Sequence, residues 1–171
     1  QLTVGAASAR SAGKSYEEAV GPRWAMTTPI PEEAKSLVVL DALADRETIA
    51  SSVDFIFCAV DMKKEEIRAL EESYAKLECP VISNNSAHRW TPDVPMVIPE
   101  VNPEHLQVIQ AQKSRLGTRR GFIAVKSNCS IQSYAPALHP LRRFGITQVL
   151  VCTYQAISGA GKTFTTWPEM V

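Results

Sequence analysis

The sequence lacks an excess of charge of either sign, and this absence argues against two classes of partner. Lysine plus arginine and aspartate plus glutamate number 18 each among the 171 residues. A balanced charge gives no reason to expect a nucleic acid or an anionic membrane surface as partner. The longest apolar runs, such as residues 55–60, have the length of a strand and are far too short to span a membrane. We therefore expect a protein that binds neither nucleic acid nor membrane.

The sequence also lacks a zinc-binding pattern of cysteines. The four are Cys58, Cys79, Cys129 and Cys152. Three of them lie in or beside strand-like sequence, so neither a disulfide framework nor a metal site is expected. Reduced thiols in a cytosolic protein are the simplest interpretation. We predict a cytoplasmic protein without a bound metal.

A signal peptide, internal repeats and low-complexity segments are absent as well. The first residues have neither the basic start nor the long apolar core of a signal peptide. The chain begins without methionine in strand-like sequence, and it ends at Val171 shortly after a glycine-rich turn. We therefore expect a fragment that is cut at both ends.

Strand-like and helix-like segments alternate along most of the chain. Hydrophobic residues make up 45% and charged residues 21%, which is typical of a globular protein. The expected strands are residues 2–7, 36–40, 53–60, 80–83, 96–98, 121–125 and 146–157, and the expected helices are 45–52, 61–78, 102–115 and 130–144. The alternation predicts an α/β fold with a Rossmann-like, mostly parallel sheet and helices on both faces. The continuous apolar run at 53–60 predicts a strand that is buried on both faces.

The polar loop after the first strand contains a candidate phosphate-binding group. In a Rossmann fold the residue after the second strand contacts the adenosine ribose: an acid suits NAD, and an arginine suits the 2′-phosphate of NADP. Here Arg10 stands between Ser8 and Ser11, with no acidic residue in the loop. A guanidinium flanked by hydroxyl donors fits a phosphate dianion. The glycine fingerprint that normally precedes such a loop is absent from the chain, and a solvated basic loop is the alternative interpretation.

Cys129 is the candidate nucleophile. It follows a predicted strand and begins a predicted helix, where amide groups and the helix dipole favour thiolate over thiol. Asn128 and Ser130 add polar groups that suit an anion or an oxyanion. A buried, inert cysteine is the alternative at this position.

Two further segments carry groups suited to ligand binding. Residues 155–162 close the last predicted strand with a glycine turn, in which Gln155 can both donate and accept hydrogen bonds. Arg89 suits a phosphate or a carboxylate. An ordinary turn and an ordinary surface arginine explain the same residues, and the three histidines are interpreted as structural.

Four motifs, in this order and spacing, resemble those of the aspartate-semialdehyde dehydrogenase family. They are Ser-Ala-Arg-Ser-Ala-Gly-Lys at 8–14, Val-Pro at 94–95 with Pro-Glu-Val-Asn at 99–102, Ser-Asn-Cys-Ser at 127–130, and Thr-Tyr-Gln-Ala-Ile-Ser-Gly-Ala-Gly at 153–161. The resemblance covers nearly the whole chain, and residues 129–141 look most like the fungal and archaeal branch.

The resemblance implies a phosphorylating aldehyde dehydrogenase that uses NADP and interconverts aspartyl phosphate and aspartate semialdehyde. Cys129 matches the nucleophile that forms the acyl thioester, and Gln155 matches the residue that orients the substrate. The remaining matches are Arg89 and Asn128 at the phosphate and substrate site, Ser8, Arg10 and Ser11 at the 2′-phosphate of the cofactor, and Ser158 and Gly159 near the nicotinamide.

The family resemblance also implies a domain division and an assembly. Residues 1–128 would form an NADP-binding Rossmann-like domain, and residues 129–171 would begin an α+β catalytic and dimerisation domain. The whole enzyme would be a homo-oligomer, a dimer or tetramer, with small-molecule substrates, and the chain by itself would be inactive. The alternatives are a thioester-forming reductase of N-acetylglutamyl phosphate or glyceraldehyde phosphate, and a non-catalytic Rossmann-like binding protein.

Overall fold

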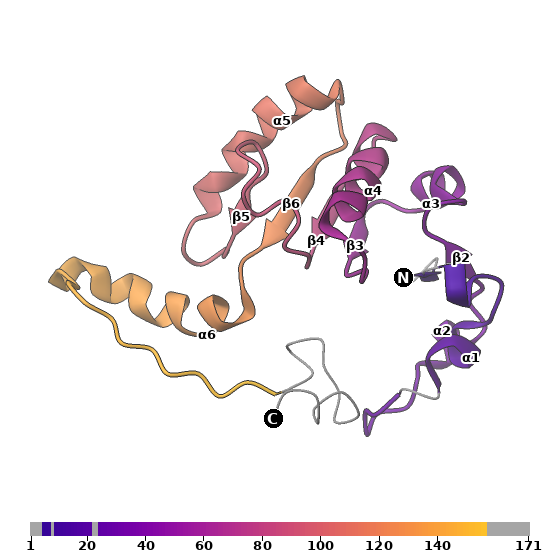
Figure 1. Cartoon of the computed structure of the whole chain (residues 1–171), viewed down its shortest axis with the longest axis horizontal. Helices are drawn as coiled ribbons and strands as arrows, with labels where there is room; N and C mark the ends of the chain where they lie inside the picture. The colour runs from indigo at the N-terminus through magenta and orange to yellow at the C-terminus, as the bar shows by residue number, and fades with distance from the viewer. Residues whose placement is uncertain (1–4, 8, 22–23, 157–171) are drawn as a thin grey trace. The chain divides into compact units, whose positions relative to one another are not determined.

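The computed structural model describes residues 5–7, 9–21 and 24–156, and the chain divides into two compact units. The first unit ends at Asn128, and the second begins at Cys129. In the first unit, four parallel strands form one sheet in the order β3-β4-β6-β5 (Figure 1). They are β3 (Ile56–Cys58), β4 (Val81–Ser83), β5 (Met96–Val97) and β6 (Ile123–Lys126). A second parallel pair joins β1 (Gly5–Ala7) to β2 (Val39–Asp41). The predicted α/β fold with parallel strands is confirmed.

The helices of the first unit follow the expected alternation only in part. They are α1 (Tyr16–Val20), α2 (Glu32–Lys35), α3 (Arg46–Ser52), α4 (Lys64–Lys76) and α5 (Ile109–Leu116), with 3-10 turns η1 (Ala9–Ser11) and η3 (Pro103–Val108). The helix expected over 102–115 is therefore a 3-10 turn followed by α5. The short helices α1 and α2 occupy sequence in which no helix was expected, and α1 begins with a capping box between Ser15 and Glu18.

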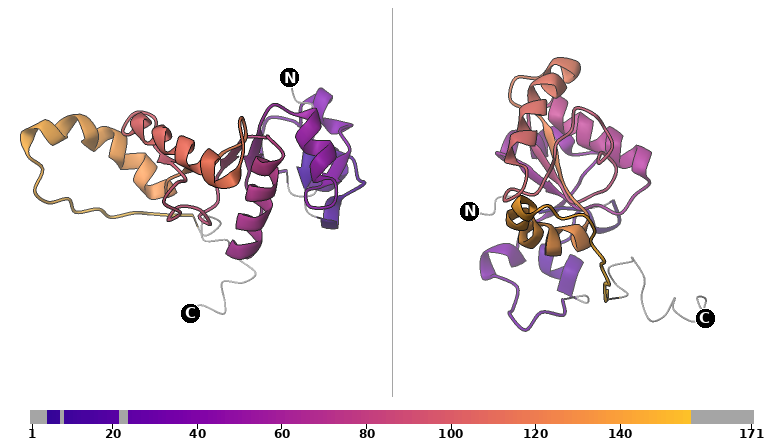
Figure 2. Two further views of the ribbon diagram at one scale, coloured as in Figure 1. Left: turned by 90° about the horizontal axis from the view of Figure 1, so that it is seen from above. Right: turned by 90° about the vertical axis from the view of Figure 1, so that its left-hand side faces the viewer.

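The core of the first unit lies between α4 and the four-stranded sheet. Helix α4 packs against β4, β6 and α5 (Figure 2). Its apolar stripe recurs at helical spacing, as the sequence predicts, and Leu70 and Tyr74 are buried in the core cluster. The Tyr74 hydroxyl also donates a hydrogen bond of 2.6 Å to the carbonyl of Ala42, which ties α4 to the chain after β2. No helix among the described residues has the length and apolar character needed to cross a membrane.

The expectation that residues 53–60 are buried on both faces is wrong. Cys58 is buried, whereas Phe57 is 77% exposed and Phe55 is 50% exposed. Among the strands that the structure describes, β3 ends its sheet and has β4 as its one pairing partner. Successive side chains of a strand point to opposite faces, so Phe57 points away from the core that holds Cys58.

The second unit consists of α6 (Cys129–Leu138) and the 3-10 turn η4 (His139–Phe144), followed by extended chain. The helix expected over 130–144 is therefore an α-helix followed by a 3-10 turn: Pro136 lies inside α6, and the α-helix gives way to η4 just before Pro140. Gly145 ends η4 in the left-handed conformation, at φ +74°. The strand expected over 146–157 is not formed in its described part: residues 146–156 are not a strand and pair with no other described strand.

A carboxylate joins the end of α4 to the start of β6. Glu78, itself at φ +62°, accepts backbone hydrogen bonds from Arg119, Arg120 and Gly121, the last two at 2.6 and 2.9 Å. These three N–H groups lower the pKa of Glu78 to about 2. Gly121 packs so tightly that a Cβ atom there would lie 1.8 Å from the carbonyl oxygen of Ala75.

We predict that Glu78→Gln lowers the melting temperature at pH 7 and that the difference from the wild type shrinks in acid. Because the folded-state pKa lies below the ordinary value of 4.5, the carboxylate stabilises the fold fully above about pH 5, and this contribution is lost as the pH falls towards 2. Thermal unfolding between pH 7 and pH 3 measures the effect. Glu100→Gln, at an exposed turn, is the control and leaves the melting temperature unchanged. A gap that stays constant over this pH range would contradict the assignment.

Candidate active site

The turn from β6 into α6 presents the candidate nucleophile to solvent. Strand β6 ends at Lys126, and Ser127 is buried. Helix α6 begins at Cys129, whose side chain is exposed. Asn128, the residue before it, is also exposed. The predicted position of Cys129, just past a strand and at the start of a helix, is confirmed.

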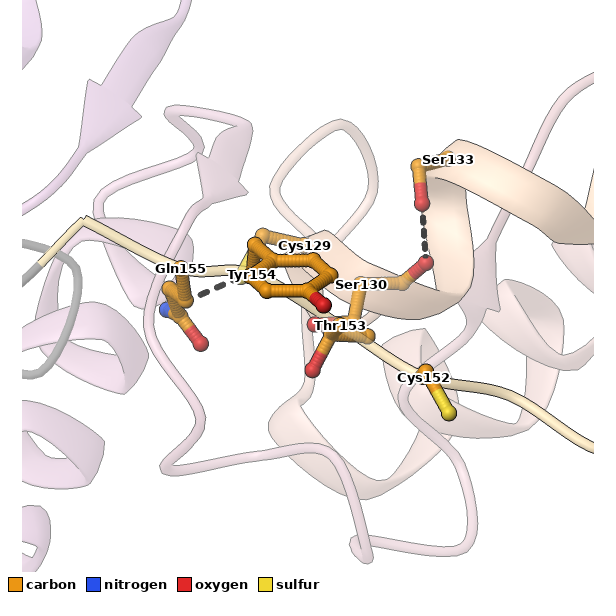
Figure 3. Close-up of a pocket in the computed structure, with 7 residues that line it drawn as sticks. All are labelled: Cys129, Ser130, Ser133, Cys152, Thr153, Tyr154 and Gln155. Carbon is orange, nitrogen blue, oxygen red and sulfur yellow. Dashed lines mark hydrogen bonds between the residues drawn. The ribbon is translucent and has the colours of Figure 1, made fainter.

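Within the second unit, Gln155 lies beside Cys129. Its side-chain amide donates a hydrogen bond to the Cys129 sulfur at 3.8 Å, although 26 residues separate them (Figure 3). The two residues line one pocket, together with Ser130, Ser133, Cys152, Thr153 and Tyr154. The structure thus brings together the two residues that the sequence singled out as catalytic.

The other three cysteines divide into two buried thiols and one exposed thiol. Burial raises the pKa of Cys58 to about 12, with a further contribution from the negative charge of Glu71. Burial also raises the pKa of Cys79. Cys152 was expected to be buried in a strand, but it is exposed and lines the same pocket as Cys129. That expectation was wrong because residues 146–156 form no strand.

Arg89 is bound to the backbone that leads to the candidate nucleophile. Its guanidinium donates to the carbonyl of Lys126 at 3.2 Å and to that of Ser127 at 3.3 Å. The side chain is half-buried. An arginine expected to be either a phosphate ligand or a surface residue is therefore fixed at the carboxyl end of β6.

The predicted cofactor loop follows β1 directly. Arg10 and Ser11 lie in η1, where Arg10 is exposed and Ser11 is half-buried. Gly13 then turns the chain at φ +81°, and its N–H donates to the carbonyl of Val39 in β2. An exposed guanidinium at the end of a parallel strand fits the 2′-phosphate of NADP. Three predicted residues, Ser8, Ser158 and Gly159, lie outside the described residues.

A buried polar cluster at the carboxyl end of β4 was not predicted. Glu71 is fully buried in α4, and the hydroxyl of Ser83 donates to its carboxylate at 2.5 Å. His88 is also buried, 3.9 Å from the same carboxylate. The sequence does contain a signal: Glu71 lies one turn after Ile67 and one turn before Tyr74, so a charged residue interrupts the apolar stripe of α4.

Comparison with known proteins relates the chain to one enzyme family. A family model described as "Semialdehyde dehydrogenase, NAD binding domain" matches residues 1–109. The aspartate-semialdehyde dehydrogenase of Aspergillus fumigatus is 39% identical over 91% of this chain and 41% of its own length. That of Methanothermobacter thermautotrophicus is 40% identical over 94% of this chain and 44% of its own length.

A solved structure shows the same relationship. The crystal structure of aspartate-semialdehyde dehydrogenase with NADP from Candida albicans is 32% identical and superposes with a TM-score of 0.69. The match covers 84% of this chain and 40% of that chain. The chain thus spans less than half the length of the curated relatives described above.

We predict that iodoacetamide at neutral pH modifies Cys129 and Cys152 in the folded protein and spares Cys58 and Cys79. The first two thiols are exposed, whereas burial keeps the other two protonated and out of reach. Peptide mapping by mass spectrometry before and after unfolding in urea measures the pattern. Modification of Cys58 in the folded protein as fast as that of Cys129 would refute the prediction.

Proposed function

The chain belongs to the semialdehyde dehydrogenase family, and we therefore propose that this protein is an NADP-dependent aspartate-semialdehyde dehydrogenase. The reaction interconverts aspartyl phosphate and aspartate semialdehyde, a step in lysine, methionine and threonine biosynthesis. The observation that carries the proposal is the hydrogen bond from Gln155 to the sulfur of Cys129, at the exposed start of α6. Relatives named for aspartate semialdehyde support this substrate over N-acetylglutamyl phosphate or glyceraldehyde phosphate.

Cys129 is the covalent nucleophile in this proposal. Its thiolate attacks the acyl carbon of aspartyl phosphate, the C–O bond to phosphate breaks, and phosphate leaves with the electron pair. The product is an acyl thioester on Cys129. Bound NADPH supplies the hydride that reduces the thioester carbonyl. The resulting thiohemiacetal expels the thiolate and releases the aldehyde, so Cys129 returns to its starting state.

Other residues bind and orient the substrates and the cofactor in this proposal. The Gln155 amide, which donates to the Cys129 sulfur, orients the substrate at the reacting carbon. Arg89 and Asn128 bind phosphate, for which a guanidinium and an amide are suitable donors. Arg10 and Ser11, with Ser8, bind the 2′-phosphate of NADP, and Ser158 and Gly159 contact the nicotinamide.

The two units divide these tasks. Residues 1–128 form the NADP-binding domain, and residues 129–171 belong to the catalytic and dimerisation domain. We further propose a homo-oligomeric enzyme, a dimer or tetramer, in the cytoplasm. The direct test is an assay of the whole protein, in which NADP is reduced only when aspartate semialdehyde and phosphate are both present. Equal rates with N-acetylglutamyl semialdehyde would contradict the assignment.

We predict that Cys129→Ser lowers the turnover of the whole protein by about three orders of magnitude or more, because a serine hydroxyl is not ionised near neutral pH. The fold and the affinity for NADP stay unchanged. The control is Cys79→Ser, which replaces a buried thiol with a hydroxyl of similar size and keeps turnover. Steady-state kinetics, with the melting temperature as a check of folding, measures both variants. Near-normal turnover in Cys129→Ser would refute the covalent mechanism.

We predict that Arg10→Ala weakens NADP binding by about tenfold to a hundredfold, the value of a charge-assisted hydrogen bond, while NAD binding changes little. The reason is that only NADP carries the 2′-phosphate that the guanidinium contacts. Isothermal titration with both cofactors measures the difference. Arg119→Ala, at another exposed arginine, is the control for loss of a positive charge. Equal losses for NADP and NAD would mean that this loop does not bind the 2′-phosphate.

A further inference from the structure

The carboxylate of Glu71 has two side-chain donors at the carboxyl end of β4. Ser83, the last residue of that strand, donates at 2.5 Å, and the side-chain amide of Asn85 donates to the same oxygen at 3.3 Å. The Asn85 amide also lies 3.4 Å from the sulfur of Cys58, at the end of β3. Glu71 therefore links α4 to the ends of two neighbouring strands.

The second oxygen of Glu71 faces His88. The Nε2 atom of His88 is 3.9 Å from this oxygen, and neither atom has a hydrogen-bond partner among the described residues. The other ring nitrogen of His88 is 3.0 Å from the hydroxyl of Thr91. The exposed fraction is 0% for Glu71 and 1% for His88. Buried polar atoms are costly when unpaired, so this arrangement calls for a reason other than packing.

Glu71, Ser83, Asn85 and His88 form a polar cluster, and its contacts hold one short loop, residues 84–89. The Asn84 N–H donates to the carbonyl of Cys58 at 2.8 Å, and the Asn85 N–H donates to the Ser83 hydroxyl at 3.0 Å. Ala87 and His88 are the buried residues of the loop, and Arg89 follows His88 directly. Ser83, Asn85 and His88 thus connect this loop to the Glu71 carboxylate. Arg68 of the same helix also holds the loop, since its Nε donates to the carbonyl of Ala87 at 2.7 Å.

The loop in turn aligns the backbone that precedes Cys129. Through Arg89 it binds the carbonyls of Lys126 and Ser127, two consecutive residues that lead into Asn128 and Cys129. A displacement of Arg89 therefore changes both the position of its own guanidinium and the support of this backbone.

We propose that Glu71 is a positioning residue, which sets loop 84–89 and through it the geometry of Arg89. The consequence for phosphate binding rests on the proposed function, since the phosphate role of Arg89 belongs to it. An apolar residue would fill the same space in α4 at less cost, because a buried carboxylate loses its hydration. The carboxylate supplies what an apolar residue cannot: an acceptor that fixes Ser83 and Asn85 and a charge that faces His88.

The first experiment measures the loop itself. Glu71→Gln keeps the size of the side chain but removes its charge and replaces one acceptor oxygen with a donor. Glu72→Gln is the matched control: it is the same change one residue later, at a partly exposed side chain paired with Arg115. We expect hydrogen exchange in a peptide covering 84–89 to be faster by about tenfold in Glu71→Gln than in Glu72→Gln, the size of a partly lost charged hydrogen bond.

The second experiment measures the consequence in the whole protein. We expect Glu71→Gln to raise the KM for phosphate by about tenfold or more, as Arg89→Ala does, because a small misplacement of a binding group has a large effect. The Kd for NADP stays unchanged, and so does the KM for phosphate in Glu72→Gln. A purely structural role would instead lower the melting temperature and the amount of active enzyme without changing the KM for phosphate.

The outcomes separate this inference from the proposed function. A whole protein that lacks aspartate-semialdehyde dehydrogenase activity refutes the proposed function, and the exchange experiment still decides the role of Glu71. Wild-type exchange of loop 84–89 in Glu71→Gln overturns the inference, as does an unchanged KM for phosphate in an active enzyme. If Glu71→Gln does not fold, Ser83→Ala takes its place, and Ser73→Ala, at a half-buried serine of α4, is its control.

Discussion

The parallel ladder between β4 and β6 is the contact on which the candidate site depends. It pairs Val81 with Ile123 and Ser83 with Val125. Parallel strands end at the same edge of a sheet, so the loop that follows Ser83 lies beside the chain that follows β6, and Arg89 can reach the carbonyls of residues 126 and 127. A shift of one residue in this register would turn Ser83 to the opposite face, away from α4, and its bond to the Glu71 carboxylate would be lost. This strand pairing thus determines the position of Arg89, the candidate phosphate-binding residue, and of the backbone that leads to Cys129.

The sequence predicts the long periodic elements well and the short ones poorly. Helix α4 and the strands β4 and β6 are found where the apolar pattern places them, because each buries a regular set of side chains in one core. Helix α1 has only five residues, too few for a periodic stripe, and its real signal is the capping box of Ser15 and Glu18. The run at 53–60 was misinterpreted for a different reason. A continuous apolar segment does not reveal whether a second layer covers its outer face, and in β3 the side chain of Phe57 on that face is exposed.

In the candidate site, too, the sequence predicts features set by neighbouring residues better than contacts between residues far apart in the chain. The exposure of Cys129 follows from its position between a strand and a helix, which the local sequence contains. Its contact with Gln155 joins residues 26 apart and was not predicted, although the family resemblance gave both residues roles in one reaction. The cluster around Glu71 was missed because its members come from α4, from the end of β4 and from the loop after it. No local pattern links these segments, although a glutamate on an apolar helix stripe is a sign of a buried polar partner.

Burial and the charge of Glu71 act together on the thiol of Cys58 at the end of β3. Cys58 ends β3 in the core, where lost hydration and the nearby charge of Glu71 keep its thiol protonated. The neutral sulfur lies 3.4 Å from the side-chain amide of Asn85, whose second contact is the Glu71 carboxylate. The carboxylate is thereby held by donors and keeps the neighbouring thiol inert. Cys129, the one cysteine assigned to covalent chemistry, instead begins α6 with an exposed side chain.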